Sequence, residues 1–128
     1  MSGTISSATL ALQRAMPMSR LLDCGMDFAD AQALLRRSSA GEAWDQAAEA
    51  LALAQLDRAA EAASTGCRVT AAEAQAAALA DLLFAQMAFN HDNPRKRALY
   101  GQLVAATQRL CEWSDGRMAR IEVPFGPG

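Results

Sequence analysis

The chain has 128 residues, a formal net charge of −2 and a hydrophobic fraction of 52%. This length suits one domain, and the interspersed acidic and basic residues lack the clustered positive charge by which proteins bind nucleic acid. No stretch reaches the roughly 20 apolar residues that cross a membrane, and no secretory signal pattern is present. We therefore expect a cytoplasmic protein without a nucleic-acid or membrane partner.

Alanine accounts for about thirty residues. It favours helices but adds little side-chain volume, so few large side chains are left to build a core. The composition therefore predicts an all-α fold with a thin core. The elements below add up to a bundle of about five helices followed by a short C-terminal extended or strand segment.

The N-terminal part begins with residues 1–6, which are small and polar and are expected to fray. A first helix is predicted from Ser7 to Met16 and ended by Pro17. A short helix is predicted from Met18 to Cys24, and Gly25 supplies a left-handed stop.

The middle of the chain predicts two further helices. Asp27 is the expected N-cap of the first, which runs to about Arg37. Its expected apolar side consists of Phe28, Ala31, Leu34 and Leu35. Gly41 precedes the second, which is predicted from Glu42 to Ala63 with Trp44 at the start of its apolar stripe.

Two start signals mark the last helices. Thr70 opens a Thr-Ala-Ala-Glu capping box, which predicts a helix to Phe89. Asn93 and Pro94 are a typical N-cap and first helical residue, and this helix is predicted to run to about Trp113.

Residues 114–116, Ser-Asp-Gly, are expected to end the helical domain, which covers residues 7–116. Residues 117–128 form a predicted extended tail, in which Met118–Phe125 alternates apolar and polar side chains as strands do. A lone strand leaves its backbone groups unpaired, so this segment needs a sheet from elsewhere.

The sequence contains no autonomous catalytic constellation, and whether the chain is an enzyme stays open. The only histidine, His91, lies in a predicted turn beside Asp92, and no Gly-x-Ser-x-Gly elbow presents a serine. Arg95–Arg97 is expected to be a solvated first helical turn.

No metal site or cofactor is predicted. The cysteines form no Cys-x-x-Cys pair and are expected to be buried or idle thiols: Cys24, Cys67 and Cys111. Acidic residues at partial helical spacing lack a histidine and are expected on solvated helix faces: Glu42, Asp45, Glu49, Asp57 and Glu61. No phosphate loop or dinucleotide fingerprint is present.

Aromatic residues are the candidates for substrate or partner contact. At helical spacing they either pack in the core or line an apolar surface that meets a ligand or second domain. The candidate contact residues are Trp44, Phe84, Phe89, Tyr100 and His91.

Four segments together resemble a known family. They are Leu21–Asp30 (LLDCGMDFAD), Gly41–Trp44 (GEAW), Leu82–Phe89 (LLFAQMAF) running into Asp92–Tyr100 (DNPRKRALY), and Arg120–Phe125 (RIEVPF). In this order they resemble the N-terminal helical domain of bacterial α/β-hydrolases such as 2,6-dihydroxypseudooxynicotine hydrolase and fermentation–respiration-switch esterases. The resemblance implies a helical lid over a catalytic domain, with 120–125 leading into the first strand of the hydrolase sheet.

In that family the catalytic triad lies in the following domain, so no residue of this chain inherits a catalytic role. The resemblance implies a non-catalytic accessory domain that shapes a substrate pocket and assembles with a catalytic α/β-hydrolase domain or chain. Two alternatives stay open. One is a stand-alone small helical enzyme or binding protein for an apolar small molecule, with His91, Asp92 and Tyr100 as candidate polar groups. The other is a homodimeric interaction module.

Overall fold

The computed structural model describes residues 4–127, which form six α-helices. They are α1 (Ser7–Ala15), α2 (Met18–Asp23), α3 (Phe28–Ser39), α4 (Trp44–Ser64), α5 (Arg68–Gln86) and α6 (Pro94–Glu112). The all-α prediction is confirmed, with six helices in place of about five. No helix in the described part of the chain combines the length and the apolar character needed to cross a bilayer.

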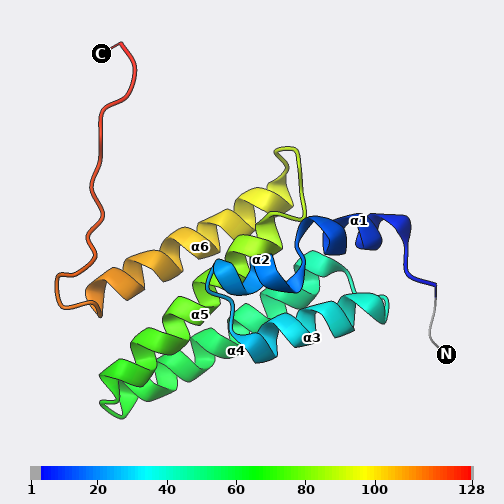
Figure 1. Ribbon diagram of the computed structural model, residues 1–128. Coiled ribbons are helices and arrows are strands. Elements are labelled where there is room, and N and C mark those ends of the chain that lie inside the picture. The colour runs from blue at the N-terminus through cyan, green and yellow to red at the C-terminus, as the bar shows by residue number, and fades with distance from the viewer. Residues whose placement is uncertain (1–3, 128) are drawn as a thin grey trace.

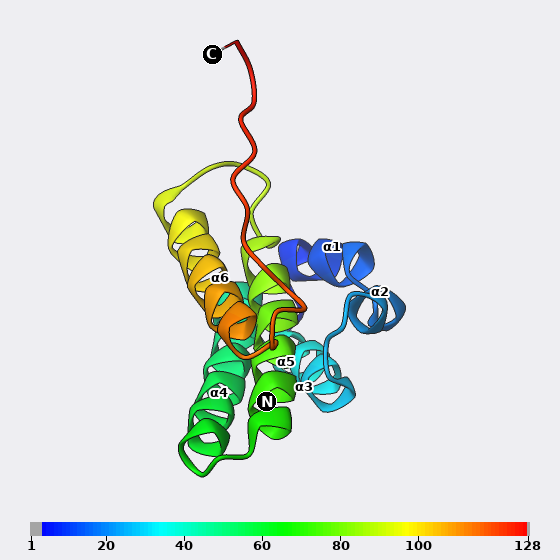
Figure 2. The same cartoon turned by 90° about the vertical axis from the view of Figure 1, so that its left-hand side faces the viewer.

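The helices are arranged around the antiparallel pair α4 and α5, which make the most extensive contact in the molecule. Helix α6 packs along α5, whereas α1, α2 and α3 lie together on another side of this pair (Figures 1 and 2). The reversal between α4 and α5 uses Gly66 at φ 80°, a left-handed conformation that glycine adopts without strain. We call α1, α2 and α3 the N-terminal layer.

The buried core consists of two clusters. The larger one joins the N-terminal layer to the near ends of α4, α5 and α6, and its largest members are Met16, Leu21, Met26, Leu34, Trp44, Phe84 and Leu99. The smaller one consists of Ala52, Leu82 and Ala106. Alanines line the α4–α5 contact, so these two helices pack closely with little side-chain volume between them.

Two of the predicted helix starts are confirmed. The Asp27 carboxylate accepts hydrogen bonds from the backbone of Ala29 and Asp30, and the Asn93 side chain accepts one from the Lys96 amide at 2.8 Å. Gly25 is left-handed at φ 91° as expected. These signals are local, so the tertiary fold does not alter them.

The prediction of a capping box at Thr70 is wrong. Helix α5 begins at Arg68, and its N-cap is Cys67, which makes no side-chain cap hydrogen bond. The backbone amide of Cys67 instead bonds to the Ala62 carbonyl at 2.8 Å, so the tight turn at Gly66 places the N-cap of α5 three residues earlier than Thr70.

The predicted C-terminal strand is also wrong. Residues 119–125 are extended, but no β-pairing occurs anywhere in residues 4–127, because this part of the chain offers no neighbouring strand. The prediction of fraying for residues 1–6 falls partly on residues 1–3, which lie outside the described residues, as does Gly128. Ser6 already caps α1 through the Thr9 amide at 3.1 Å.

Candidate functional site

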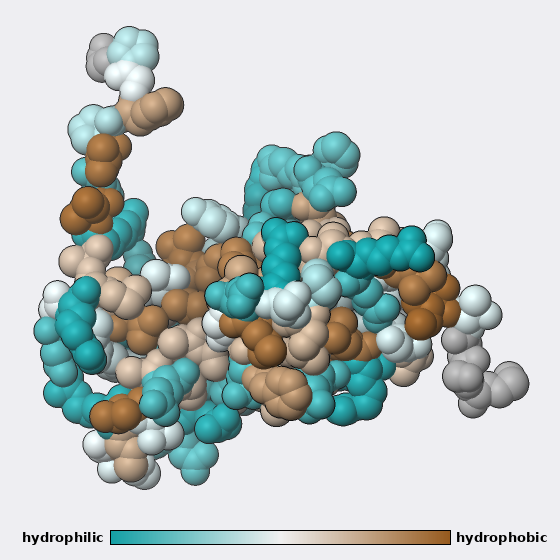
Figure 3. Space-filling view, viewed as in Figure 1, coloured by the Kyte–Doolittle hydropathy of each residue, from teal (hydrophilic) through white to brown (hydrophobic). Residues whose placement is uncertain are grey.

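The C-terminal segment, residues 117–127, carries the largest group of exposed apolar side chains. It leaves the end of α6 and extends away from the helical body (Figures 1 and 2). Ile121, Val123 and Phe125 are 77%, 74% and 102% exposed, and apolar residues follow one another along this segment in Figure 3. Residues 119–127 make no backbone hydrogen bond. Unpaired backbone groups beside apolar side chains are typical of a strand that pairs with another chain or domain.

The direction of this segment is set by a hydrogen-bonded turn after α6. Asp115 and Gly116 are left-handed at φ 52° and 81°. The buried Ser114 hydroxyl donates to the Cys111 carbonyl at 2.8 Å and accepts from the Met118 amide at 3.0 Å. The turn therefore fixes where the segment leaves the helical body.

A groove of about 480 Å³ separates the start of the segment from α6. Its α6 wall is formed mainly by Tyr100, Leu103, Val104, Thr107 and Cys111, and the facing wall by Met118, Ala119, Arg120 and Ile121. Tyr100 is 59% exposed at one end. The groove and the C-terminal segment form one continuous, mainly apolar surface, which we call the α6–segment surface.

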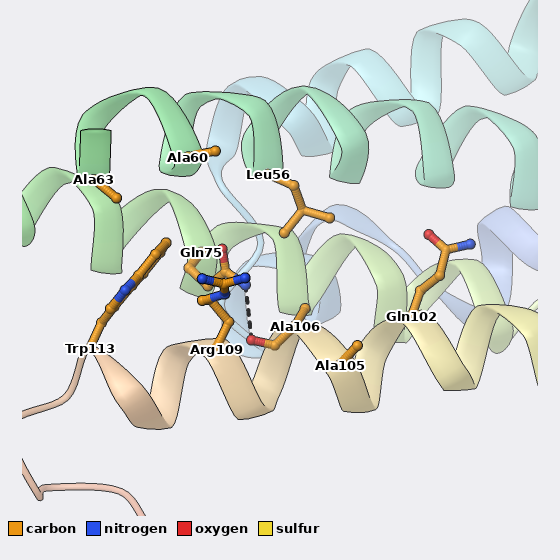
Figure 4. A pocket seen from close by; sticks show the side chains of 9 residues that line it. All are labelled: Leu56, Ala60, Ala63, Gln75, Gln102, Ala105, Ala106, Arg109 and Trp113. Carbon is orange, nitrogen blue, oxygen red and sulfur yellow. Dashed lines mark hydrogen bonds between the residues drawn. The ribbon is translucent and has the colours of Figure 1, made fainter. Parts of the chain in front are cut away.

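A second groove, of about 440 Å³, runs between α4 and α6 above α5 (Figure 4). Its apolar lining consists mainly of small side chains: Leu56, Ala60, Ala63, Ala105 and Ala106. The Gln75 amide donates to the Ala106 carbonyl at 2.9 Å, and the Arg109 guanidinium lies 5.7 Å from the centre of the Trp113 ring. The carboxylate nearest to Arg109 belongs to Glu112 at 3.9 Å, in an exposed pair that leaves the guanidinium able to bind another anion.

Three predicted contact residues lie together in the core. Trp44 and Phe84 are buried, and the Trp44 indole donates to the Phe84 carbonyl at 3.0 Å. Phe89 is partly buried and packs against the same cluster. In this structure these side chains hold the N-terminal layer to α4 and α5.

The other two candidates lie apart from that cluster. Tyr100 belongs to the α6–segment surface. His91 is exposed in the turn between α5 and α6. The Asp92 carboxylate is bound by Arg97, with one bond of 2.8 Å, and makes no hydrogen bond to the His91 ring. The polar group proposed from the sequence, His91, Asp92 and Tyr100, therefore does not converge on one pocket.

The charged residues at the start of α6 are less solvated than predicted. Arg95 binds the Asp45 carboxylate at 2.9 Å and the Glu49 carboxylate at 3.0 Å and 3.1 Å. This network tethers α6 to α4, because the two acids lie one turn apart on α4. The Arg95 guanidinium lowers the pKa of the Glu49 carboxyl. Lys96 donates to the Phe89 carbonyl at 2.5 Å.

Three further expectations need correction. Glu42 was expected on a solvated face but forms a two-bond pair with Arg37 at 2.6 Å and 2.8 Å, which lowers the pKa of Glu42. Cys24 and Cys67 are exposed, so the expected burial of the thiols does not hold for them. Phe28 was expected on the apolar side of α3 but is 55% exposed, because α3 turns Ala31 and Leu34 toward the core.

A buried polar cluster at the junction of α3, α4 and α5 was missed by the sequence reasoning. Asp81 on α5 is fully buried, and neither of its carboxyl oxygens has a hydrogen-bond partner among residues 4–127. Asp30 on α3 lies within hydrogen-bonding reach. The Gln55 amide on α4 donates to Asp30 at 2.8 Å. Burial, with Asp30 nearby, raises the pKa of Asp81 to about 9.

The described residues include no group of three or more histidines, cysteines and acidic residues arranged to hold a metal ion. Comparison with known protein families, with curated proteins and with solved structures found no match.

Proposed function

We propose that this chain is a non-catalytic helical accessory domain of an α/β-hydrolase-like system, placed over the substrate pocket of a catalytic domain or chain. The observation that supports this proposal is the C-terminal segment, which carries exposed apolar side chains, is extended over residues 119–125 and makes no backbone hydrogen bond from residue 119 to residue 127. The resemblance noted above gives the same segment, 120–125, the place of the lead into a hydrolase sheet.

The segment would attach by strand addition. Ile121, Val123 and Phe125 alternate with Glu122 and Pro124, so in a strand they share one face. That face would pack on the partner while the backbone of 119–125 pairs with a neighbouring strand. The groove along α6 would receive side chains of the same partner, because it is continuous with the segment.

Attachment in this way would hold the helical body in a fixed place relative to the partner, because the turn at Ser114 sets the direction of the segment. A helical body over a pocket excludes water and shapes the space for an organic acyl or carbonyl substrate. All bond-breaking chemistry would belong to the partner.

The test is purification of the tagged protein from its source cells, with identification of co-purifying chains and assay of ester hydrolysis. We expect a partner with a Gly-x-Ser-x-Gly elbow and hydrolytic activity in the complex. The triple variant Ile121→Ser, Val123→Ser, Phe125→Ser should lose both. Val69→Ser is the matched control, because Val69 on α5 has the same 74% exposure as Val123. A partner without a nucleophile elbow, or equal loss in both variants, contradicts the proposal.

A second function, binding of an apolar small molecule, is favoured by the groove between α4 and α6. Its alanine walls suit a slender apolar chain, and Arg109 offers hydrogen-bond donors suited to a carboxylate. Titration with a medium-chain fatty acid should quench Trp113 fluorescence in the wild type and the Arg14→Gln control but not in Arg109→Gln. Equal quenching in Arg109→Gln would exclude this site.

Self-association is the third possibility, because the C-terminal segment of one copy can pair with that of another. Light scattering of the purified chain separates this case from the first. A dimer that the triple variant abolishes favours a homodimeric module, whereas a monomer that gains mass only with a hydrolase chain favours the accessory domain.

A further inference from the structure

Asp81 occupies an unusual place for a carboxyl group. It lies on α5 where α3 and α4 meet that helix, its side chain is fully buried, and neither oxygen accepts a hydrogen bond from any residue in the described range. An ionised carboxylate in such surroundings is very unfavourable, because it has lost its water and gained no donor or cation. A protonated carboxyl needs only an acceptor for its one O–H.

The acceptor is supplied by α3. Asp30 lies within hydrogen-bonding reach of Asp81, and Asp27 adds a further negative charge nearby. The Asp27 carboxylate is already engaged by the amides of Ala29 and Asp30 at the start of α3. Two neighbouring carboxyl groups away from water are stable together when they share one proton.

Helix α4 supplies the hydrogen bonds on the Asp30 side of the pair. The Gln55 amide donates to Asp30 at 2.8 Å, and Arg58 donates to the Gln55 side-chain oxygen at 3.1 Å. These two bonds hold the Asp30 carboxyl group in place beside α4. The charged groups that act on Asp81, within residues 4–127, are Asp30 and Asp27, and both favour the protonated form of Asp81.

We propose that Asp81 and Asp30 form a one-proton carboxyl pair that locks α3, and with it the N-terminal layer, onto α4 and α5, and that loss of this proton releases the layer. Helix α3 contributes Ala31 and Leu34 to the cluster that contains Trp44 and Phe84. Release would therefore expose the larger core cluster. The device depends on groups of this chain alone, the buried Asp81 and the partly buried Asp30, and does not require the proposed function.

The proton makes the lock sensitive to alkaline pH. Burial, followed by Asp30 and Asp27, raises the pKa of Asp81 from 3.8 to about 9. A group whose folded pKa is raised contributes most below its ordinary value, and this contribution is lost as the pH rises through the folded value. The lock is thus protonated at neutral pH, weakens as the pH rises above the ordinary pKa of Asp81, and has lost this contribution by about pH 9.

The first test is infrared spectroscopy of the full chain, which detects the C=O stretch of a protonated carboxyl. We expect this band at pH 7 in the wild type and its loss as the pH rises through about 9. Asp81→Asn should lack the band at pH 7. Asp57→Asn, a change at an exposed aspartate of α4, should retain it. A wild type without the band at pH 7 would overturn the proposal.

The second test follows release of the layer through Trp44 fluorescence, with Trp113→Phe as the background so that one tryptophan reports. Emission should shift to longer wavelength near pH 9 in the wild type but not in Asp81→Asn, whose amide still donates to Asp30. The folded-to-unfolded ratio at pH 7 should rise about a thousandfold in Asp81→Asn. The same alkaline shift in Asp81→Asn would refute the lock.

The third test uses a divalent cation. Addition of Ca²⁺ or Mg²⁺ at pH 7 should leave the infrared band and the stability of the wild type unchanged. If either ion abolishes the band and stabilises the wild type but not Asp81→Asn, the pair is a cation site and the shared proton is excluded.

Discussion

The two ends of the helical body are built differently. At one end the N-terminal layer covers α4 and α5, and large side chains such as Leu34, Phe84 and Leu99 are fully buried. At the other end only α4, α5 and α6 are present, and the buried cluster is reduced to Ala52, Leu82 and Ala106. Alanine allows close contact between two helices but cannot fill the space where a third helix diverges. The groove between α4 and α6 and the C-terminal segment therefore lie at the second end.

The residues that stabilise the fold and the surfaces proposed to bind a partner therefore lie in different parts of the bundle. The closed end contains the large apolar side chains together with the Asp30–Asp81 pair. The open end contains the exposed segment and the groove between α4 and α6, and the groove along α6 runs from Tyr100 toward this end. Substitutions at the closed end should therefore change folding, and substitutions at the open end should change binding.

The largest expected effect is the loss of a core side chain at the closed end. Trp44→Ala should lower the free energy of unfolding by about 3–5 kcal/mol, because it removes a buried aromatic and leaves a cavity. Leu103→Ala, a half-buried position in the smaller cluster, should cost about 1 kcal/mol. Urea unfolding of both variants measures the difference. Equal losses would show that the two ends contribute equally to the fold.

The second effect has the opposite sign. Asp81→Asn should raise the free energy of unfolding at pH 7 by about 4 kcal/mol, because the wild-type carboxyl holds a proton about three pH units above its ordinary pKa and each unit is worth about 1.4 kcal/mol. The wild type should lose stability from about pH 4 to pH 9, whereas Asp81→Asn should not show this slope. Urea unfolding across this pH range checks the sign, and identical slopes would contradict it.

Features set by a few neighbouring residues were predictable from the sequence. Asp27 and Asn93 act as caps, and Gly25 as a left-handed stop, because each involves only backbone groups within a few residues. The start of α5 was not predictable in this way, because the tight turn at Gly66 overrides the cap signal at Thr70.

Features that depend on distant residues were not predictable. The alternation in 118–125 correctly indicates extended backbone, but pairing needs a second strand that the pattern cannot reveal. Asp81 stands in the middle of an apolar run of α5, and this position is visible in the sequence. Its meaning depends on Asp30 and Gln55, which only the packing of α3 and α4 brings near it. Both grooves likewise depend on how α6 packs.

A smaller effect is expected at the tether between α4 and α6. Arg95→Gln should cost about 1–2 kcal/mol, because three partly buried charge-assisted hydrogen bonds are lost. The pKa of Glu49 is lowered by Arg95, so this contribution is present above the ordinary value of 4.5 and is lost as the pH falls through the folded value. Arg97→Gln, at an exposed pair, is the control and should stay within about 0.5 kcal/mol.

The smallest effect on stability is expected at the C-terminal segment, and it is the most informative about function. The triple variant Ile121→Ser, Val123→Ser, Phe125→Ser should change the free energy of unfolding by less than about 0.5 kcal/mol, because these side chains are 74% exposed or more and contribute to neither core cluster. Urea unfolding measures this value, and partner capture measures the loss of binding. A variant that unfolds more easily would show that the segment folds back onto the bundle. A stable variant that no longer binds would place the interaction at the open end, where the core is thinnest and an added strand buries apolar side chains that the helices leave in water.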